Sequence, residues 1–137
     1  MSTLAKVIPW ICLGTALLAG DLAPSIEAKM VRAIVGASGG GKVECDNKEL
    51  AGLLTGLGVS VDPSAKLAWA DSDKDASRLS KQGKLVMCGN QDWFAQGAAL
   101  AFTAEGGRPV IYLNLTNLAL SGISLPDSIV KLSKVVK

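Results

Sequence analysis

The feature that most constrains the fold is a pair of apolar runs joined by a tight turn, at residues 98–115 (AALAFTAEGGRPVIYLNL). Glu105-Gly106-Gly107-Arg108 separates the two runs. Consecutive glycines supply the positive φ values that a short hairpin turn requires. The segment therefore predicts an antiparallel β-hairpin near residues 98–115.

Candidate strands and helices alternate along the rest of the chain. Leucines repeat at helical spacing within 48–58, and an acidic and basic stretch over 71–83 is typical of a solvent-facing helix. Strands are predicted at residues 30–36, 59–61, 65–70 and 84–90. This alternation predicts an α/β sandwich with the antiparallel hairpin at one edge of its sheet.

The end of the chain predicts a C-terminal helix. Pro126 suits the first helical position, because its missing N–H would have no intrahelical partner there. The predicted inner face of this helix consists of Ile129, Leu132, Val135 and Val136.

Residues 1–28 are predicted to be a signal peptide, which leaves residues 29–137 as one folded domain. Lys6 provides a short positive region, and residues 7–20 form an apolar run of secretory length. That run is too short for a comfortable membrane span. A retained N-terminal helix is the alternative interpretation.

Cleavage is expected after Ala28, where Ile26 stands at the minus-three position, and Ala23 is the alternative cleavage position. On this interpretation the domain is periplasmic or secreted. It would not be stably inserted in a membrane once the leader has been removed.

Two of the three cysteines, Cys45 and Cys88, lie in the predicted mature domain. An even count in an exported protein indicates one disulfide, which would contribute about 4 kcal/mol by closing a long loop. Two separate buried thiols are the alternative. Neither cysteine belongs to a Cys-x-x-Cys pair, so the sequence predicts no redox motif and no zinc knuckle.

The composition excludes several classes of function. The chain has no histidine, which removes the usual general base and the usual zinc ligand. Asp71, Asp73 and Asp75 resemble the start of a calcium loop, but Ala76 and Gln82 occupy the places of its glycine and glutamate. We therefore expect no metal, no cofactor and no catalytic residue. The net charge of +2 comes from scattered basic residues, which argues against a nucleic-acid surface.

A glycine-rich stretch at residues 36–42 resembles a phosphate-binding loop. Val43 stands where that motif needs a Ser or Thr hydroxyl for Mg²⁺, and the residues after it look extended. A nucleotide site is therefore not predicted. A weaker alternative remains, in which the turn binds an anion beside the carboxyl edge of the sheet. The residues of that anion site would be Gly39, Gly40, Gly41 and Lys42.

Aromatic residues are scarce, and three of them are candidates for contact with a partner. Trp69 lies in a predicted strand, and Trp93 and Phe94 begin the segment after Asn90. Such residues can line a pocket or a protein-binding patch, and they can equally cover a small core.

The C-terminal third resembles the YfiR family of small periplasmic proteins, mainly over residues 84–136. The resemblance lies in the order of a glycine turn, a hairpin, an Asn, a short helix with Gly and a Leu-rich end. It is carried by Gly89, Asp92-Trp93-Phe94, Gly97-Ala98-Ala99-Leu100-Ala101-Phe102, Glu105-Gly106-Gly107-Arg108, Ile111-Tyr112-Leu113-Asn114-Leu115, Ser121-Gly122-Ile123-Ser124-Leu125 and Ile129-Val130-Lys131-Leu132.

The resemblance implies a Rossmann-like three-layer α/β sandwich with a mixed sheet and no catalytic residues. It also implies a regulator that binds a membrane signalling protein, such as a diguanylate cyclase of the cyclic-di-GMP system, and a homodimer is left open. The chain departs from the family in three respects: it is short, it has Gly97-Ala98 in place of a double glycine, and the aromatic-rich first helix is missing. Two disulfides, as in the founding members, cannot form from Cys45 and Cys88 alone.

Overall fold

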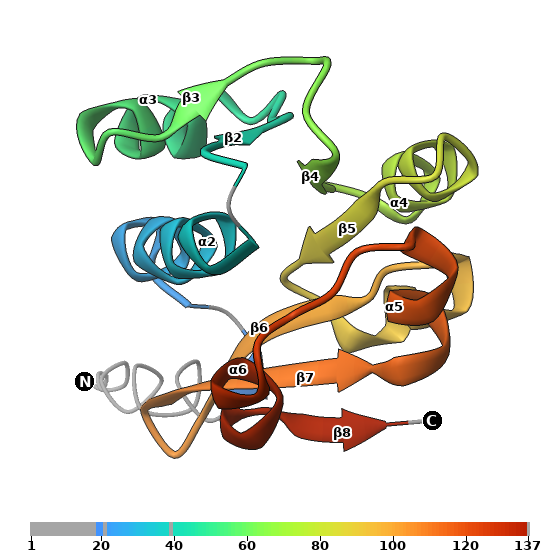
Figure 1. Ribbon diagram of the computed structural model, residues 1–137. Helices are drawn as coiled ribbons and strands as arrows, with labels where there is room; N and C mark the ends of the chain where they lie inside the picture. Colours follow the sequence, from blue (N-terminus) through green and yellow to red (C-terminus); the bar gives the residue numbers. More distant parts are fainter. Residues whose placement is uncertain (1–18, 21, 39, 137) are drawn as a thin grey trace, which may run out of the picture.

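The computed structural model describes residues 19–20, 22–38 and 40–136, and Figure 1 shows their arrangement. The main sheet has the strand order β4-β5-β6-β7-β8, and β1 pairs with β6 beside this path. Its strands are β1 Ala19–Gly20, β4 Leu67–Trp69, β5 Leu85–Cys88, β6 Leu100–Glu105, β7 Arg108–Asn114 and β8 Lys134–Val136. A second, parallel sheet consists of β2 Lys42–Val43 and β3 Ser60–Val61.

The helices are α2 Pro24–Ser38, α3 Lys48–Gly56, α4 Asp73–Lys81, the 3₁₀ helix η1 Gln91–Gln96, α5 Leu115–Ser121 and α6 Asp127–Leu132. Strands β4, β5 and β6 run parallel, whereas β6 and β7 are antiparallel. The main sheet is therefore mixed, as predicted.

The predicted hairpin is confirmed. Leu100 pairs with Leu113 and Glu105 pairs with Arg108. Gly106 and Gly107 both have positive φ, at 59° and 79°, which is the conformation that the Gly-Gly turn was expected to adopt. The hairpin lies inside the sheet rather than at its edge, because β8 pairs with the outer side of β7.

Two apolar clusters cover the two faces of the sheet. Along β5, Leu85 and Met87 belong to the cluster that includes residues of α2 and α3, whereas Val86 and Cys88 belong to the cluster that includes α4 residues. This alternation is the period of two expected for a strand that is buried on both faces. Helices therefore pack on both faces, and the predicted α/β sandwich of three layers is confirmed (Figure 1).

The segment 30–36, predicted as a strand, is part of helix α2. The buried side chains of α2 are Ala28, Val31, Ile34 and Val35, which recur at helical spacing. They pack against α3 and the sheet, so tertiary burial prevails over the β-branched composition of the segment.

The C-terminal helix is confirmed, but it ends earlier than predicted. Helix α6 stops at Leu132, Ser133 is extended, and residues Lys134–Val136 form β8 parallel to β7. The predicted inner face is wrong in part, because Leu132 is 73% exposed and Val135 is 45% exposed. Pairing with a distant strand decides the conformation of these residues.

Candidate functional site

The candidate site lies where several parallel strands end at one edge of the sheet. Strands β4 and β5 are parallel, and Glu44, just after β2, forms a parallel bridge with Ala68 of β4. The chain passes through α3 to β3 on one side of β2 and then to β4 on its other side. This reversal is a topological switch point, and the crevice beyond the carboxyl ends of such strands is the usual ligand site of open α/β sheets.

Strands β2, β4 and β5 are followed by helices α3, α4 and η1, and a polar side chain caps the N-terminus of each helix. The Asn47 side chain accepts from the Leu50 N–H at 2.9 Å and the Ser72 hydroxyl accepts from the Asp75 N–H at 3.0 Å. Asn90 likewise accepts from the Asp92 N–H at 2.9 Å. Side-chain caps satisfy backbone donors that have no partner within the helix. Three helix N-termini are thereby fixed around one edge.

Asp71 links the ends of β2 and β4 across the switch point. Its Oδ1 accepts a hydrogen bond from Trp69 Nε1 at 2.9 Å and another from Asn47 Nδ2 at 3.2 Å. Asp71 N–H in turn donates to Asp75 Oδ2 at 3.3 Å. The carboxylate is therefore held in position by Trp69 of β4 and by Asn47 of the loop after β2.

The switch-point hollow, as we name it, has a volume of about 260 Å³. It is lined by Glu27, Trp69, Ala70, Asp71, Gly89, Asn90 and Trp93. Two of these side chains are carboxylates, two are indoles and none is basic. The hollow is therefore acidic and partly aromatic.

Gly89 leaves room for the carboxylate of Glu27 of α2 beside the loop after β5. A Cβ added at residue 89 would lie 3.2 Å from Glu27 Oε2. That distance is tighter than an ordinary van der Waals contact. The glycine thus allows a carboxylate from α2 to approach the loop after β5.

A cationic side chain stands next to this acidic edge. Arg78 of α4 forms an ion pair with Asp75 at 2.6 Å, and longer ones with Asp46 at 3.8 Å and Glu44 at 3.9 Å. The hydrogen bond to Asp75 raises the pKa of Arg78 above its ordinary value. Arg78 does not line the switch-point hollow.

The three aromatic candidates occupy different environments. Trp69 is only 5% exposed and its ring stacks on Phe102, with centroids 6.1 Å apart. Trp93 and Phe94 are partly buried in η1 against the opposite core cluster. Trp69 and Trp93 line the switch-point hollow, whereas Phe94 does not. The structure therefore brings two of the three residues together.

The predicted disulfide is absent, and the alternative of two separate buried thiols is what the structure contains. Cys45 packs in the cluster on the α2 side of the sheet and Cys88 in the cluster on the α4 side, so the side chains lie on opposite faces. A disulfide needs Cβ atoms about 3.8 Å apart. Burial raises the pKa of each thiol from 9.0 to about 11.

The glycine-rich turn connects a helix to a strand, which is the reverse of a phosphate-binding loop. Helix α2 ends at Ser38 and β2 begins at Lys42, so the turn lies at the amino edge of the sheet rather than at the expected carboxyl edge. A helix C-terminus carries partial negative charge, which disfavours an anion. Lys42 Nζ lies 3.9 Å from Asp62 Oδ2, so this lysine already has a carboxylate as its ion-pair partner. Gly40 and Lys42 do border a hollow of about 270 Å³, whereas Gly39 lies outside the described residues.

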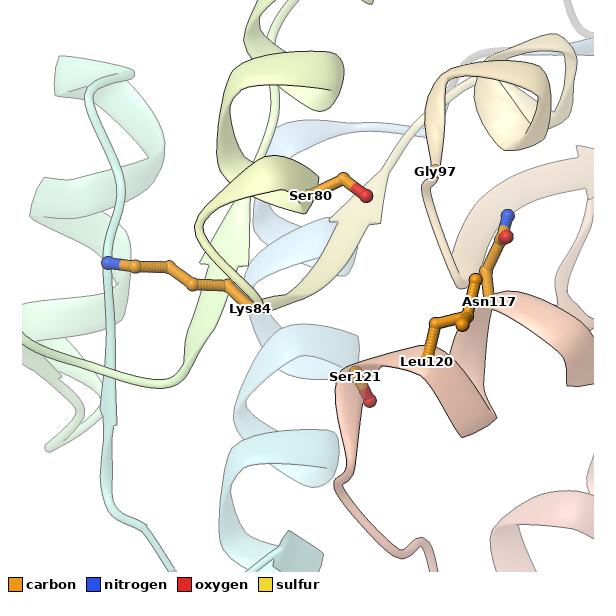
Figure 2. Close-up of a pocket in the computed structure, with 6 residues that line it drawn as sticks. All are labelled: Ser80, Lys84, Gly97, Asn117, Leu120 and Ser121. Carbon is orange, nitrogen blue, oxygen red and sulfur yellow. The ribbon is translucent and has the colours of Figure 1, made fainter.

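A smaller hollow lies between α4 and α5, as Figure 2 shows. Its volume of about 20 Å³ suffices for one water molecule. Asn117 on its wall donates to Phe94 O at 2.9 Å and to Ala98 O at 2.8 Å, which fixes α5 to the end of η1. At about 20 Å³ this hollow is too small for a ligand larger than a water molecule.

Within the described part of the chain, no three potential metal ligands gather in one place. Among the helices that the structure describes, none combines the length and hydropathy needed to cross a lipid bilayer. Residues 1–18, which contain most of the predicted signal peptide, lie outside the described residues.

Sequence reasoning missed the roles of Glu27, Gly89 and Asn90. Glu27 was assigned to the leader, and only the packing of α2 brings it to the hollow. Asn90 carried a usable signal, because Asn is one of the residues preferred at a helix N-cap and it directly precedes η1.

A comparison with protein-family models gives no match, and neither does a comparison with curated proteins. Among solved structures, the chain is similar to a conserved domain protein from Vibrio cholerae, with a TM-score of 0.54 and 10% identity. The similarity covers 83% of this chain and 60% of that one, so this chain spans about 60% of the other protein's length. At this identity the likeness defines the class of fold alone, an α/β sandwich.

Proposed function

We propose that this chain is an exported, non-enzymatic binding domain of the YfiR-like type, which regulates a membrane signalling protein by direct contact. The observation that carries the proposal is that the polar side chains at the carboxyl edge make structural hydrogen bonds within the fold. Asn47, Ser72 and Asn90 cap helices, and Asp71 ties two loops together. These groups shape a rigid surface, which suits recognition of a partner.

The thiols fit the same proposal. A cysteine nucleophile needs a lowered pKa and solvent access. Cys45 and Cys88 are both buried, and their pKa values are raised to about 11 by burial. The sequence offers no histidine to activate a hydroxyl or a thiol.

Helix α2 bears on where the exported chain would begin. Ala28 is fully buried in the core, and cleavage after it would remove the first turns of α2. Cleavage after Ala23 would leave α2 whole, since the helix begins at Pro24. We therefore propose Ala23 over Ala28 as the cleavage position, which N-terminal sequencing of the exported protein tests directly.

Regulation of a diguanylate cyclase is tested by deleting the gene in its own host and measuring cellular cyclic-di-GMP. Because the founding YfiR proteins inhibit their cyclase, we expect the level to rise on deletion and to return when the full chain is supplied. The Trp93→Ala variant should fail to restore it, whereas Leu132→Ala, which truncates an apolar residue that is 73% exposed on α6, should succeed. An unchanged level after deletion would contradict the proposed function.

A further inference from the structure

The switch-point hollow has the chemistry of a site for an organic cation. Among the residues that the structure describes, its lining contains the carboxylates of Glu27 and Asp71 and no basic side chain. Helix N-termini at this edge would favour an anion, but acidic residues in their first turns offset that preference. These residues are Glu49 in α3, Asp73 and Asp75 in α4, and Asp92 in η1.

The size of the hollow separates an organic cation from a metal ion. A volume of about 260 Å³ is far more than a bare ion occupies. Two carboxylates also supply at most four oxygens, whereas Ca²⁺ takes six to eight. A guanidinium or alkylammonium group with its attached carbon chain suits both the volume and the charge.

Asp71 is positioned to accept hydrogen bonds from such a group. Both of its described side-chain hydrogen bonds, from Trp69 and Asn47, end on Oδ1. Among the described residues, Oδ2 of Asp71 has no donor, so it can accept a bond from a ligand. Charge-assisted bonds of this kind are stronger than neutral ones.

The indoles provide the second element of the site. Trp69 belongs to one core cluster and Trp93 packs against the other, so the hollow lies at the end of the sheet between its two faces. An indole face attracts a cation within about 6 Å of the ring centroid. Trp93 is only partly buried, which leaves indole surface for a ligand.

We propose that the switch-point hollow binds a guanidinium or ammonium group between Trp93 and the carboxylates of Glu27 and Asp71. The group belongs either to a basic side chain of a protein partner or to a free organic amine. Binding of a partner's side chain rests on the proposed function, whereas binding of a free organic amine does not.

The proposal is tested by titrating the ¹⁵N-labelled full chain with n-propylguanidinium at constant ionic strength and following the tryptophan indole N–H signals. The neutral isostere n-propylurea is the matched ligand control. We expect saturable shifts of the Trp69 and Trp93 signals with n-propylguanidinium only. Equal shifts with both compounds, or no saturable shift, would overturn the proposal.

Two variants locate the bound cation. Glu27→Gln keeps the size of the side chain and removes one lining charge, and it should weaken binding at least about fivefold, as expected for loss of a charge-assisted hydrogen bond. Glu49→Gln removes the same charge from an exposed position outside the hollow and should change affinity less than about twofold. Equal affinities of the two variants would also overturn the proposal.

Partner capture by the same variants distinguishes the two sources. If Glu27→Gln weakens both n-propylguanidinium binding and capture of the membrane partner, a basic side chain of the partner is the ligand. If only n-propylguanidinium binding weakens, the hollow takes a free organic cation, and the proposed function is unaffected. If the guanidinium does not bind while cyclic-di-GMP still responds to deletion of the gene, the cation site fails and the proposed function stands.

Discussion

Gly97 is the position where one added methyl group should cost the fold most. It closes η1 with φ at +107°, and a Cβ there would lie 2.1 Å from Ser80 Oγ and 2.5 Å from Ser80 Cβ. A left-handed conformation costs a non-glycine residue about 1–2 kcal/mol. Overpacking against Ser80 adds about 1–3 kcal/mol. Gly97→Ala should therefore lower the free energy of unfolding by about 3 kcal/mol.

Urea denaturation of the full chain, followed by tryptophan fluorescence, measures this loss. With an m-value of about 1.5 kcal/mol/M, a loss of about 3 kcal/mol lowers the midpoint by about 2 M. Gly122→Ala is the matched control, because Gly122 has φ of +72° and no atom within 4 Å of an added Cβ. It should lose about 1–2 kcal/mol, the conformational cost alone.

A second variant separates the two causes. In the Ser80→Gly background the steric term disappears, so Gly97→Ala should cost only about 1–2 kcal/mol more than that background. If Gly97→Ala proves no more costly than Gly122→Ala, or equally costly with and without Ser80, the reasoning from packing is refuted.

Three further predictions use the same urea assay. The thiols of Cys45 and Cys88 have pKa values of about 11 in the folded chain, against an ordinary 9.0, so the unfolded chain releases these protons at lower pH. The free energy of unfolding should therefore fall as the pH rises from 9 to 11. A constant or rising free energy of unfolding over this range would contradict the prediction. Leu113→Ala, at a fully buried position, should lower the free energy of unfolding by about 2–5 kcal/mol, and Leu132→Ala by less than about 0.5 kcal/mol. Equal losses would contradict the exposed position of Leu132 at the end of α6. Thr103→Val should raise the free energy of unfolding by about 1 kcal/mol, because the buried Thr103 hydroxyl has no hydrogen-bond partner among the described residues, and a loss would show that it does have one.

The parts of the fold that sequence reasoning predicted are those fixed by local chemistry. The Gly106-Gly107 turn specifies its hairpin through backbone conformation, and Gly83 just after α4 has the positive φ of a helix end. Leu50, Leu53 and Leu54 lie in α3 as their spacing predicts, and Leu57 is its C-cap residue. Each of these signals acts within a few residues, so no knowledge of the tertiary structure was needed.

The errors arose where long-range packing decides the structure. Val31, Ile34 and Val35 are β-branched but occupy one face of α2, and a leader boundary at residue 28 hid the first turns of that helix. Residues Lys134–Val136 become a strand only because β7 is beside them.

The candidate site was predictable in its parts but not as a whole. Trp69 and Trp93 were named from the sequence as contact residues, and both line the switch-point hollow. Their proximity depends on the parallel pairing of β4 and β5, and the acidity of the hollow depends on Glu27 reaching Gly89 from α2. No local pattern reports either contact.

The most direct measurement of the central claim is site-specific photocrosslinking in the host with the full chain. A crosslinking amino acid at exposed Asp92, in η1, is compared with one at exposed Ser60, which pairs with the first residue of β2 at the opposite edge of the sheet. We predict that position 92 captures a membrane signalling protein through its extracytoplasmic domain and that position 60 does not. Capture of the same protein from both positions, or from neither, would contradict a partner site at the carboxyl edge.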